Sequence, residues 1–298
     1  MHKYLRAIGF SQLETKKELQ ELIKKSIIVA SGREYAKKNQ HSTDIEYKRE
    51  VAPSIGIIIR GEFDSENMFV YSHYLPYLRG NYISSKEDIT IERHMEKETF
   101  AGVCDDIKVG VTMIFYLQNT IPYLRRKYGN RLPAKDTRLV LSALSVEGII
   151  MMPLEKNKIG KHIVNKALEN RIKLIQEARE GNEEAIEILT LEDIETYSTI
   201  SRKMRKDDVF TLVDTYFMPY GVECDQYSIL GEIMDFRKEI NILSKEEVYI
   251  ITLNCNDILL DMCINVIDLV GEPEKGRRFR GIIWLQGEIE YSDTKLEQ

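Results

Sequence analysis

The sequence predicts an α+β protein in which two antiparallel, β-rich modules are separated by a helical segment. Short apolar runs divided by Gly, Asn, Asp and Ser recur towards both ends of the chain, and this rhythm is typical of strands joined by tight turns. The middle differs, because its apolar residues recur at helical spacing. We therefore expect an N-terminal helix and β-rich module at 1–155, a helical linker or cover at 156–206, and a C-terminal β-rich module at 207–298.

The N-terminal module is expected to start with a helix over residues 15–25. Thr15 and Glu18 have the spacing of a capping box, and the apolar residues that follow lie on one helical face. A second, short helix is expected at 120–128, with Pro122 in its first turn. The strand patterns of this module lie at 45–51, 55–59, 68–71, 89–91, 109–117, 138–144 and 148–152.

The central segment carries three apolar stripes of helical period, at about 159–178, 185–189 and 194–204. These helices either bridge the two β-rich modules or cover one of them. The strand rhythm then returns at 209–217, 229–234, 248–253, 258–270 and 278–285.

Two pairs of similar segments raise the hypothesis that the modules arose by internal duplication. Tyr74–Tyr77 precedes Cys104–Ile107, and the similar Phe217–Tyr220 precedes Cys255–Ile258. Duplication would give this pattern, and so would chance convergence, because apolar strands and Pro-Tyr turns resemble one another. A strand order common to both modules would support the duplication.

The composition is that of an ordinary globular protein, with 43% hydrophobic and 30% charged residues in a chain of 298. A net charge of −6 argues against general nucleic-acid binding, which needs clustered Lys and Arg. The sequence contains neither an apolar run of roughly 18 residues nor a recognisable signal peptide, so we expect no membrane insertion and a cytoplasmic location.

Motifs for metals, cofactors and nucleotides are incomplete. The cysteines at 104, 224, 255 and 263 have neither zinc-site nor redox spacing, and three of them lie in apolar surroundings. Gly271–Arg278 has the glycine spacing of a phosphate-binding P-loop, but Arg277 and Arg278 stand where Lys and Ser or Thr would contact phosphate and magnesium. We therefore expect no cofactor and no metal.

The strongest candidate for a ligand-binding site is a basic C-terminal hairpin that contains Arg277, Arg278, Arg280 and the only tryptophan, Trp284. Arginine binds carboxylates and phosphates through paired hydrogen bonds and stacks on aromatic rings. These residues would recognise an anionic small molecule or an acidic protein surface. The alternative is structural, with alternating arginines on the solvated face of an edge strand.

Catalytic residues cannot be assigned from spacing. His73 lies in a tyrosine-rich segment, and His94 lies close to Glu92 and Glu96. A histidine near carboxylates can act as a tuned acid or base. An ordinary strand position is the simpler interpretation for both, although catalytic groups meet in space rather than along the chain.

Two segments carry a resemblance to a known family. The opening Met1–Phe10 and the stretch Leu269–Gly287, which includes the Gly-Arg-Arg-Phe-Arg-Gly motif, resemble an uncharacterised bacterial family. That family is a domain of unknown function found in anaerobic Gram-positive bacteria. The resemblance covers essentially the whole chain and implies a cytosolic protein without an assigned activity, so it transfers no catalytic residue and no cofactor.

The sequence therefore favours a non-enzymatic cytosolic binding or scaffolding protein whose partner is an unknown protein or an anionic small molecule. The alternative is a hydrolase-type enzyme that acts on an anionic substrate, with carboxylate and histidine groups assembled from distant positions. A pocket in which carboxylate, histidine and arginine converge would favour the enzyme.

Overall fold

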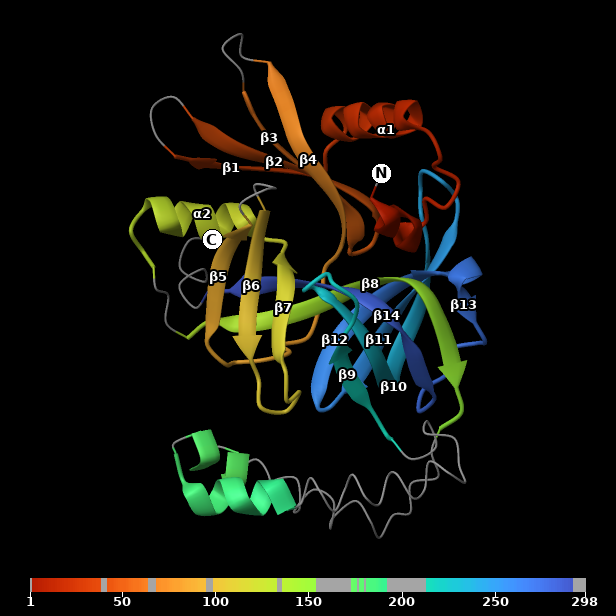
Figure 1. Ribbon diagram of the computed structural model, residues 1–298. Coiled ribbons are helices and arrows are strands. Elements are labelled where there is room, and N and C mark those ends of the chain that lie inside the picture. Colours follow the sequence, from red (N-terminus) through yellow and green to blue (C-terminus); the bar gives the residue numbers. More distant parts are fainter. Residues whose placement is uncertain are drawn as a thin grey trace.

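Two β-sheets organise the protein (Figure 1). This computed structural model describes residues 2–38, 42–63, 68–94, 99–132, 136–153, 173–175, 177–179, 181–191 and 213–291. The smaller sheet is antiparallel and has the order β1-β2-β3-β4, formed by Gly32–Lys37, Thr43–Ala52, Ile55–Phe63 and Phe69–Leu78. Its strands follow one another along the chain, in agreement with the hairpin rhythm of the sequence.

Five strands of the larger sheet close into a barrel-like ring. The ring closes because β14 pairs with β10 on one side and with β8 on the other, while β8 runs parallel to β12. Asn256 and Asp257 form the two-residue turn between β11 and β12, with φ of 51° and 60°, as a type I′ hairpin turn requires. The ring strands are β8 (Arg138–Met151), β10 (Gln226–Ile240), β11 (Glu247–Cys255), β12 (Ile258–Asn265) and β14 (Arg278–Glu290).

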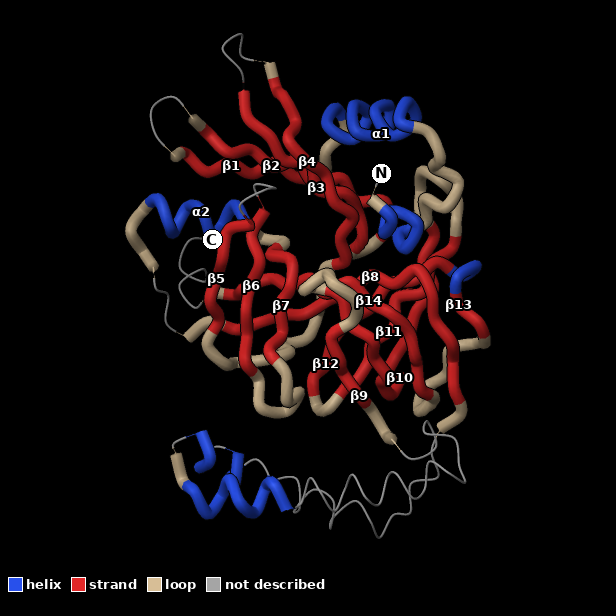
Figure 2. Tube along the Cα trace, viewed as in Figure 1, coloured by secondary structure: helices blue, strands red, loops and turns tan. Residues whose placement is uncertain are grey.

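Shorter strands extend the ring at its sides (Figure 2). On one side, β7 (Thr112–Leu117) pairs with β14. Next to β7 lies β6 (Thr99–Asp105), and β5 (Ile89–His94) pairs with β6 at the edge of the sheet. In addition, β9 (Tyr216–Pro219) pairs with β10, and β13 (Leu269–Val270) pairs with β8.

Both predicted N-terminal-module helices are present. α1 spans Lys16–Ile28, and its capping box is formed as predicted, because the Thr15 hydroxyl accepts from the Glu18 backbone N–H while the Glu18 carboxylate accepts from that of Thr15. α2 spans Thr120–Tyr128. Of the central helical segment, 173–175, 177–179 and 183–191 are helical, Gly181 and Asn182 are described but not helical, and the remaining residues lie outside the described part. Two 3₁₀ helices, η1 (Lys3–Ile8) and η3 (Val266–Asp268), were not predicted.

The apolar core has two parts. One fills the ring and the space beneath β5–β7, with Phe279, Leu285 and Phe115 each fully buried. The other lies between the four-stranded sheet, η1, α1 and the outside of the ring, and it includes Ile57 and Trp284. The two sheets thus share a core rather than standing apart.

A pair of glutamines also joins the sheets. Gln118 donates to the Leu78 carbonyl over 2.9 Å and to the side-chain oxygen of Gln286 over 2.6 Å. Gln286 in turn donates to the Pro76 carbonyl over 2.9 Å. Because both side chains are buried, these bonds fix β4 against β7 and β14.

The four-stranded sheet has two distinct faces. Its inner face turns towards α2 and the ring, and there Glu34 of β1 lies 3.7 Å from Arg125 of α2. Its outer face carries α1, whose Leu19 and Ile23 pack in one cluster with Ile57 of β3. The inner face forms one wall of the cleft described below.

The fold is mostly β and is compatible with the predicted α+β class, although parallel pairs join β8 to β12 and β13, and β14 to β7. The structure does not show an internal duplication. Tyr74–Tyr77 lies in β4 of the small sheet, whereas Phe217–Tyr220 contains β9 at the side of the ring. The strand orders around the two segments differ accordingly.

The division at 1–155, 156–206 and 207–298 stays a prediction about domain boundaries. Strands from both ends of the chain share the larger sheet, since β8 of the first range pairs with β12 and β14 of the last.

Candidate functional site

A cleft of about 200 Å³ lies between the inner face of the four-stranded sheet, α2 and the pair β5–β6. Its apolar lining includes Phe100, Ile121 and Leu124, all buried. Its polar lining is formed by Lys38, Asp44, Arg60, Glu62, Ser72, His73, Arg93, Lys127 and Tyr128. Four cationic side chains therefore meet two carboxylates in this cleft.

Arg60 stands at the buried end of the cleft and is neutralised locally. Its Nε donates to Glu46 over 2.6 Å, and its other nitrogens donate to the Tyr116 hydroxyl and the Gln118 carbonyl. Lys48 lies 3.2 Å from the second Glu46 oxygen. Because this carboxylate is fully buried, the two cations compensate a charge that would otherwise be costly to remove from water.

His73 is held in a directed chain of hydrogen bonds that begins at Arg60. The Tyr116 hydroxyl accepts from Arg60 over 3.0 Å, which leaves its own proton for His73 Nε2, 3.4 Å away. The His73 Nδ1–H then donates to Ser72 Oγ over 3.0 Å, and the Ser72 hydroxyl donates to the Arg60 carbonyl over 3.2 Å. This arrangement assigns the proton of the neutral imidazole to Nδ1.

Burial, followed by the nearby Arg60 charge, lowers the pKa of His73 to about 4. The imidazole is consequently uncharged at neutral pH. The positive charge at the cleft comes from lysine and arginine.

Two lysines lie at the exposed rim. Lys127 of α2 is 5.9 Å from the ring centres of Phe100 and Tyr123, and Lys38 follows the end of β1. Within the described ranges, neither lysine forms an ion pair. The carboxylate Asp44 accepts a hydrogen bond of 3.0 Å from Tyr128, and burial together with this bond raises the pKa of that phenol.

The four predicted binding residues contact different parts of the protein. Arg277 pairs with Glu274 over 2.6 Å, and Arg280 lies between Ile149 and Leu230 in the strand register. Arg278 is buried and donates to the carbonyls of two segments that are distant in sequence, Met152 over 3.2 Å and Val213 over 2.9 Å.

Trp284 is 5% exposed and belongs to an aromatic cluster. Its indole N–H donates to Asp225 over 2.7 Å, and its ring stacks on Tyr4 with centres 5.3 Å apart. His2 and Tyr116 contact the same ring. A role of these four residues in ligand binding stays a prediction, with Arg277 and Arg280 as the less buried members.

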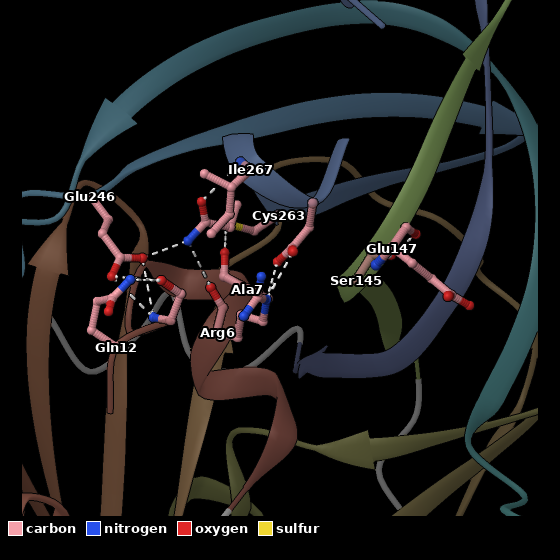
Figure 3. Close-up of polar contacts among 11 residues, drawn as sticks. Arg6, Ala7, Gln12, Ser145, Glu147, Glu246, Cys263 and Ile267 are labelled. Atoms are coloured by element: carbon pink, nitrogen blue, oxygen red, sulfur yellow. Dashed lines mark hydrogen bonds and ion pairs between the residues drawn. The ribbon is translucent and has the colours of Figure 1, made fainter. Parts of the chain in front are cut away.

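The N-terminal segment is fastened to the ring by a polar network (Figure 3). Arg6 binds both oxygens of Asp268, and Glu246 accepts from Ser11 and Asn265. The Cys263 thiol contacts the Ala7 carbonyl at 3.3 Å. On one side the partners lie in η1 and the residues that follow it. On the other side they lie at the end of β12, in η3 and at Glu246, just before β11. The network therefore has a structural role: it fixes the N-terminal segment to the ring.

Sequence reasoning did not identify the cleft. It named His73 as a catalytic candidate, but not Lys38, Arg60 or Lys127. The available signal was Arg60 itself, the one charged residue that directly follows the apolar run Ile55–Ile59. The other candidate, His94, ends β5, and its side chain lies outside the described part.

Cys104, Cys255 and Cys263 are buried, as expected from their apolar surroundings, and Cys224 is exposed. Burial raises the pKa of Cys104 to about 11 and that of Cys255 to about 12. Among the described residues, no three His, Cys, Asp or Glu side chains are grouped to hold a metal ion. No helix in that part of the chain is long and apolar enough to cross a membrane.

The chain matches a known protein family over most of its length. A family model described as "Domain of unknown function, E. rectale Gene description (DUF3881)" matches residues 5–287. The resemblance inferred from the two ends of the sequence, to a family of unknown function that covers the chain, is thereby confirmed. Neither a curated protein nor a solved structure matches the chain.

Proposed function

The chain belongs to this family of unknown function, and from its own geometry we propose that it is a binding protein that holds a small anionic molecule in the cleft. The observation that carries the proposal is the charge of the lining, where Lys38, Arg60, Arg93 and Lys127 lie with the carboxylates Asp44 and Glu62, while the buried Glu46 neutralises Arg60. The whole chain has a net charge of −6, so this local excess of positive charge runs against its composition.

The rim lysines are the proposed contacts to the anion. Arg60 is occupied by Glu46, and Asp44 is occupied by Tyr128, whereas Lys38 and Lys127 form no ion pair within the described part. A lysine ammonium binds phosphate or carboxylate as a point charge. The buried rings and aliphatic side chains of Phe100, Ile121 and Leu124 would then contact the apolar part of the ligand.

The size of the cleft limits the ligand. The cleft has a volume of about 200 Å³. Sites for drug-sized molecules usually have about 300–1,000 Å³. We therefore propose a small phosphate ester or carboxylate rather than a dinucleotide.

Binding is favoured over catalysis by the state of His73. With a pKa of about 4 the imidazole is a weak base at neutral pH. In addition, the directed hydrogen-bond chain makes Ser72 an acceptor from His73 rather than a donor to it. A serine in that state is not activated as a nucleophile.

A hydrolase remains the second candidate because histidine, arginine and carboxylates do line one cleft. Release of phenol from phenyl phosphate measures this directly. An activity that disappears in both Ser72→Ala and His73→Gln would support the enzyme and contradict the assignment of protons given above.

The binding proposal is tested by calorimetry with inorganic phosphate, glycerol 3-phosphate and phenyl phosphate. We expect at least one probe to bind, and the double variant Lys38→Gln/Lys127→Gln to bind it at least tenfold more weakly. The matched control is Lys16→Gln/Lys17→Gln, which removes the same charge from the exposed start of α1. Equal weakening in the control, or no binding of any probe, would refute the proposal.

The same measurement tests the C-terminal hairpin as the binding site. Arg277→Ser and Arg280→Ser are suitable because these side chains are less buried than Arg278. If these two variants lose the probe while the lysine variant keeps it, the ligand binds at the hairpin and the cleft assignment is wrong.

A further inference from the structure

The two faces of the four-stranded sheet carry opposite charge. Side chains alternate between faces along a strand, and the strand register shows which of them share a face. All carboxylates of the described strands in this sheet lie on the inner face: Glu34, Asp44, Glu46, Glu50 and Glu62. The charged residues of the outer face are the cations Arg33, Lys37 and Arg49.

The same outer face is aromatic beyond the end of α1. The ring of Phe69 is 4.9 Å from Tyr47 and 6.1 Å from Phe63, which places the three on one side of the sheet. The strand register places Tyr35 and Tyr71 on this same side of the sheet, because Tyr35 lies opposite Ile45, Ile45 opposite Gly61, and Gly61 opposite Tyr71. Their side chains are 61% and 40% exposed. We call these five aromatic residues, together with Arg33, the aromatic face.

Arg33 is held with its hydrogen-bond donors available. Its guanidinium lies 5.3 Å from the ring centre of Tyr47 and 5.8 Å from that of Phe63. The side chain is exposed and forms no ion pair within the described residues. A stacked guanidinium keeps its in-plane N–H groups free, and these groups match the two oxygens of a carboxylate.

We propose that the aromatic face is a docking surface for an acidic segment of another protein, in which carboxylates alternate with aromatic or aliphatic side chains. Charge complementarity favours this occupant, because the outer side of the sheet, which contains the aromatic face, carries Arg33, Lys37 and Arg49 and no carboxylate among its described strand residues. Its composition, rich in Tyr, Phe and Arg, is also that of the centre of protein interfaces. Three cations in a chain with a net charge of −6 are few for the phosphate backbone of a nucleic acid.

This surface is separate from the cleft. The aromatic face lies on the outer side of the sheet, whereas Asp44, Arg60 and Glu62 of the cleft lie on the inner side. The docking proposal therefore does not depend on the proposed binding of a small anion.

The test uses fluorescence anisotropy with a labelled 12-residue peptide in which Glu alternates with Leu and Tyr. The comparison probes are the same peptide with Gln in place of Glu and a labelled 12-nucleotide oligothymidine. We expect the acidic peptide to bind at least tenfold more tightly than either comparison probe. Arg33→Glu should weaken its binding at least tenfold, and Tyr35→Ser should weaken it several-fold.

The matched control is Lys17→Glu, which makes the same change in charge at the far end of α1 and should change the affinity less than twofold. Thermal unfolding monitors the fold of each variant. Lys38→Gln/Lys127→Gln should keep the peptide affinity, which separates this surface from the cleft. No preference for Glu over Gln, equal loss in Lys17→Glu, or tighter binding of the oligonucleotide would each overturn the proposal.

Discussion

The buried pair Arg60–Glu46 provides the most demanding test of the structure. Replacing Arg60 by Met removes a cation that donates to Glu46 over 2.6 Å and leaves a carboxylate that is fully buried. Breaking a buried ion pair in this way typically costs about 3–5 kcal/mol, because the remaining charge is uncompensated. Lys48 stays 3.2 Å from the other Glu46 oxygen, so we expect a value near the lower end, about 3 kcal/mol.

The double variant Arg60→Met/Glu46→Met removes both charges together. Well-packed apolar replacements of a buried pair are often neutral or stabilising, so the double variant should recover most of the loss. Urea denaturation of wild type, both single variants and the double variant gives the free energies of unfolding and the coupling energy. A loss of less than 1 kcal/mol in Arg60→Met, or no recovery in the double variant, would refute a buried, mutually dependent pair.

Three further predictions concern His73, Trp284 and Gly102. The pKa of His73 is about 4 in the folded protein, against 6.5 ordinarily. As the pH falls, the unfolded chain therefore takes up the His73 proton before the folded protein does. The free energy of unfolding should thus be highest above about pH 6.5 and should decrease as the pH falls towards 4. Comparing wild type with His73→Gln by denaturation at each pH should show a difference of up to about 3 kcal/mol, and parallel pH profiles would contradict the assigned burial. Trp284→Phe keeps an aromatic ring but removes the 2.7 Å bond to Asp225, which should cost about 1.5–3 kcal/mol, whereas an unchanged unfolding midpoint would show that this bond contributes nothing. Gly102→Ala would place its Cβ 2.1 Å from the Phe115 ring and should lower the free energy of unfolding by about 1–3 kcal/mol. In thermal unfolding, adding Phe115→Leu to Gly102→Ala should restore part of the lost stability. No restoration would show that the clash with Phe115 is not the cause of the loss.

Local features of the fold could be predicted because their causes are local. The capping box at Thr15 and Glu18 predicts α1, and the alternation along residues 45–51 predicts β2. Closure of the ring could not be predicted in the same way. The pairing of β8 with β12 and β14 depends on contacts between residues more than a hundred positions apart, which periodicity does not record.

The candidate site was hidden for a related reason. Lys38, Arg60, Arg93 and Lys127 come from four separate parts of the chain, so no spacing along the sequence brings them together. In contrast, Arg277, Arg278 and Arg280 are close together in sequence and attract attention, yet Arg278 is buried in β14 and Arg277, just before that strand, pairs with Glu274. Arg278 also shows that a conspicuous arginine can have backbone carbonyls as its partners.

The contacts of Arg278 have a consequence for how this chain can vary. Met152 and Val213 are 61 positions apart in sequence, yet one guanidinium binds the carbonyls of both. The two ends of the intervening stretch, at Met152 and Val213, are therefore held close to each other by the side chain of Arg278. A short linker would span that distance as well as a long one does. The length of this stretch can therefore change in evolution or by engineering while the fold on either side of it is preserved.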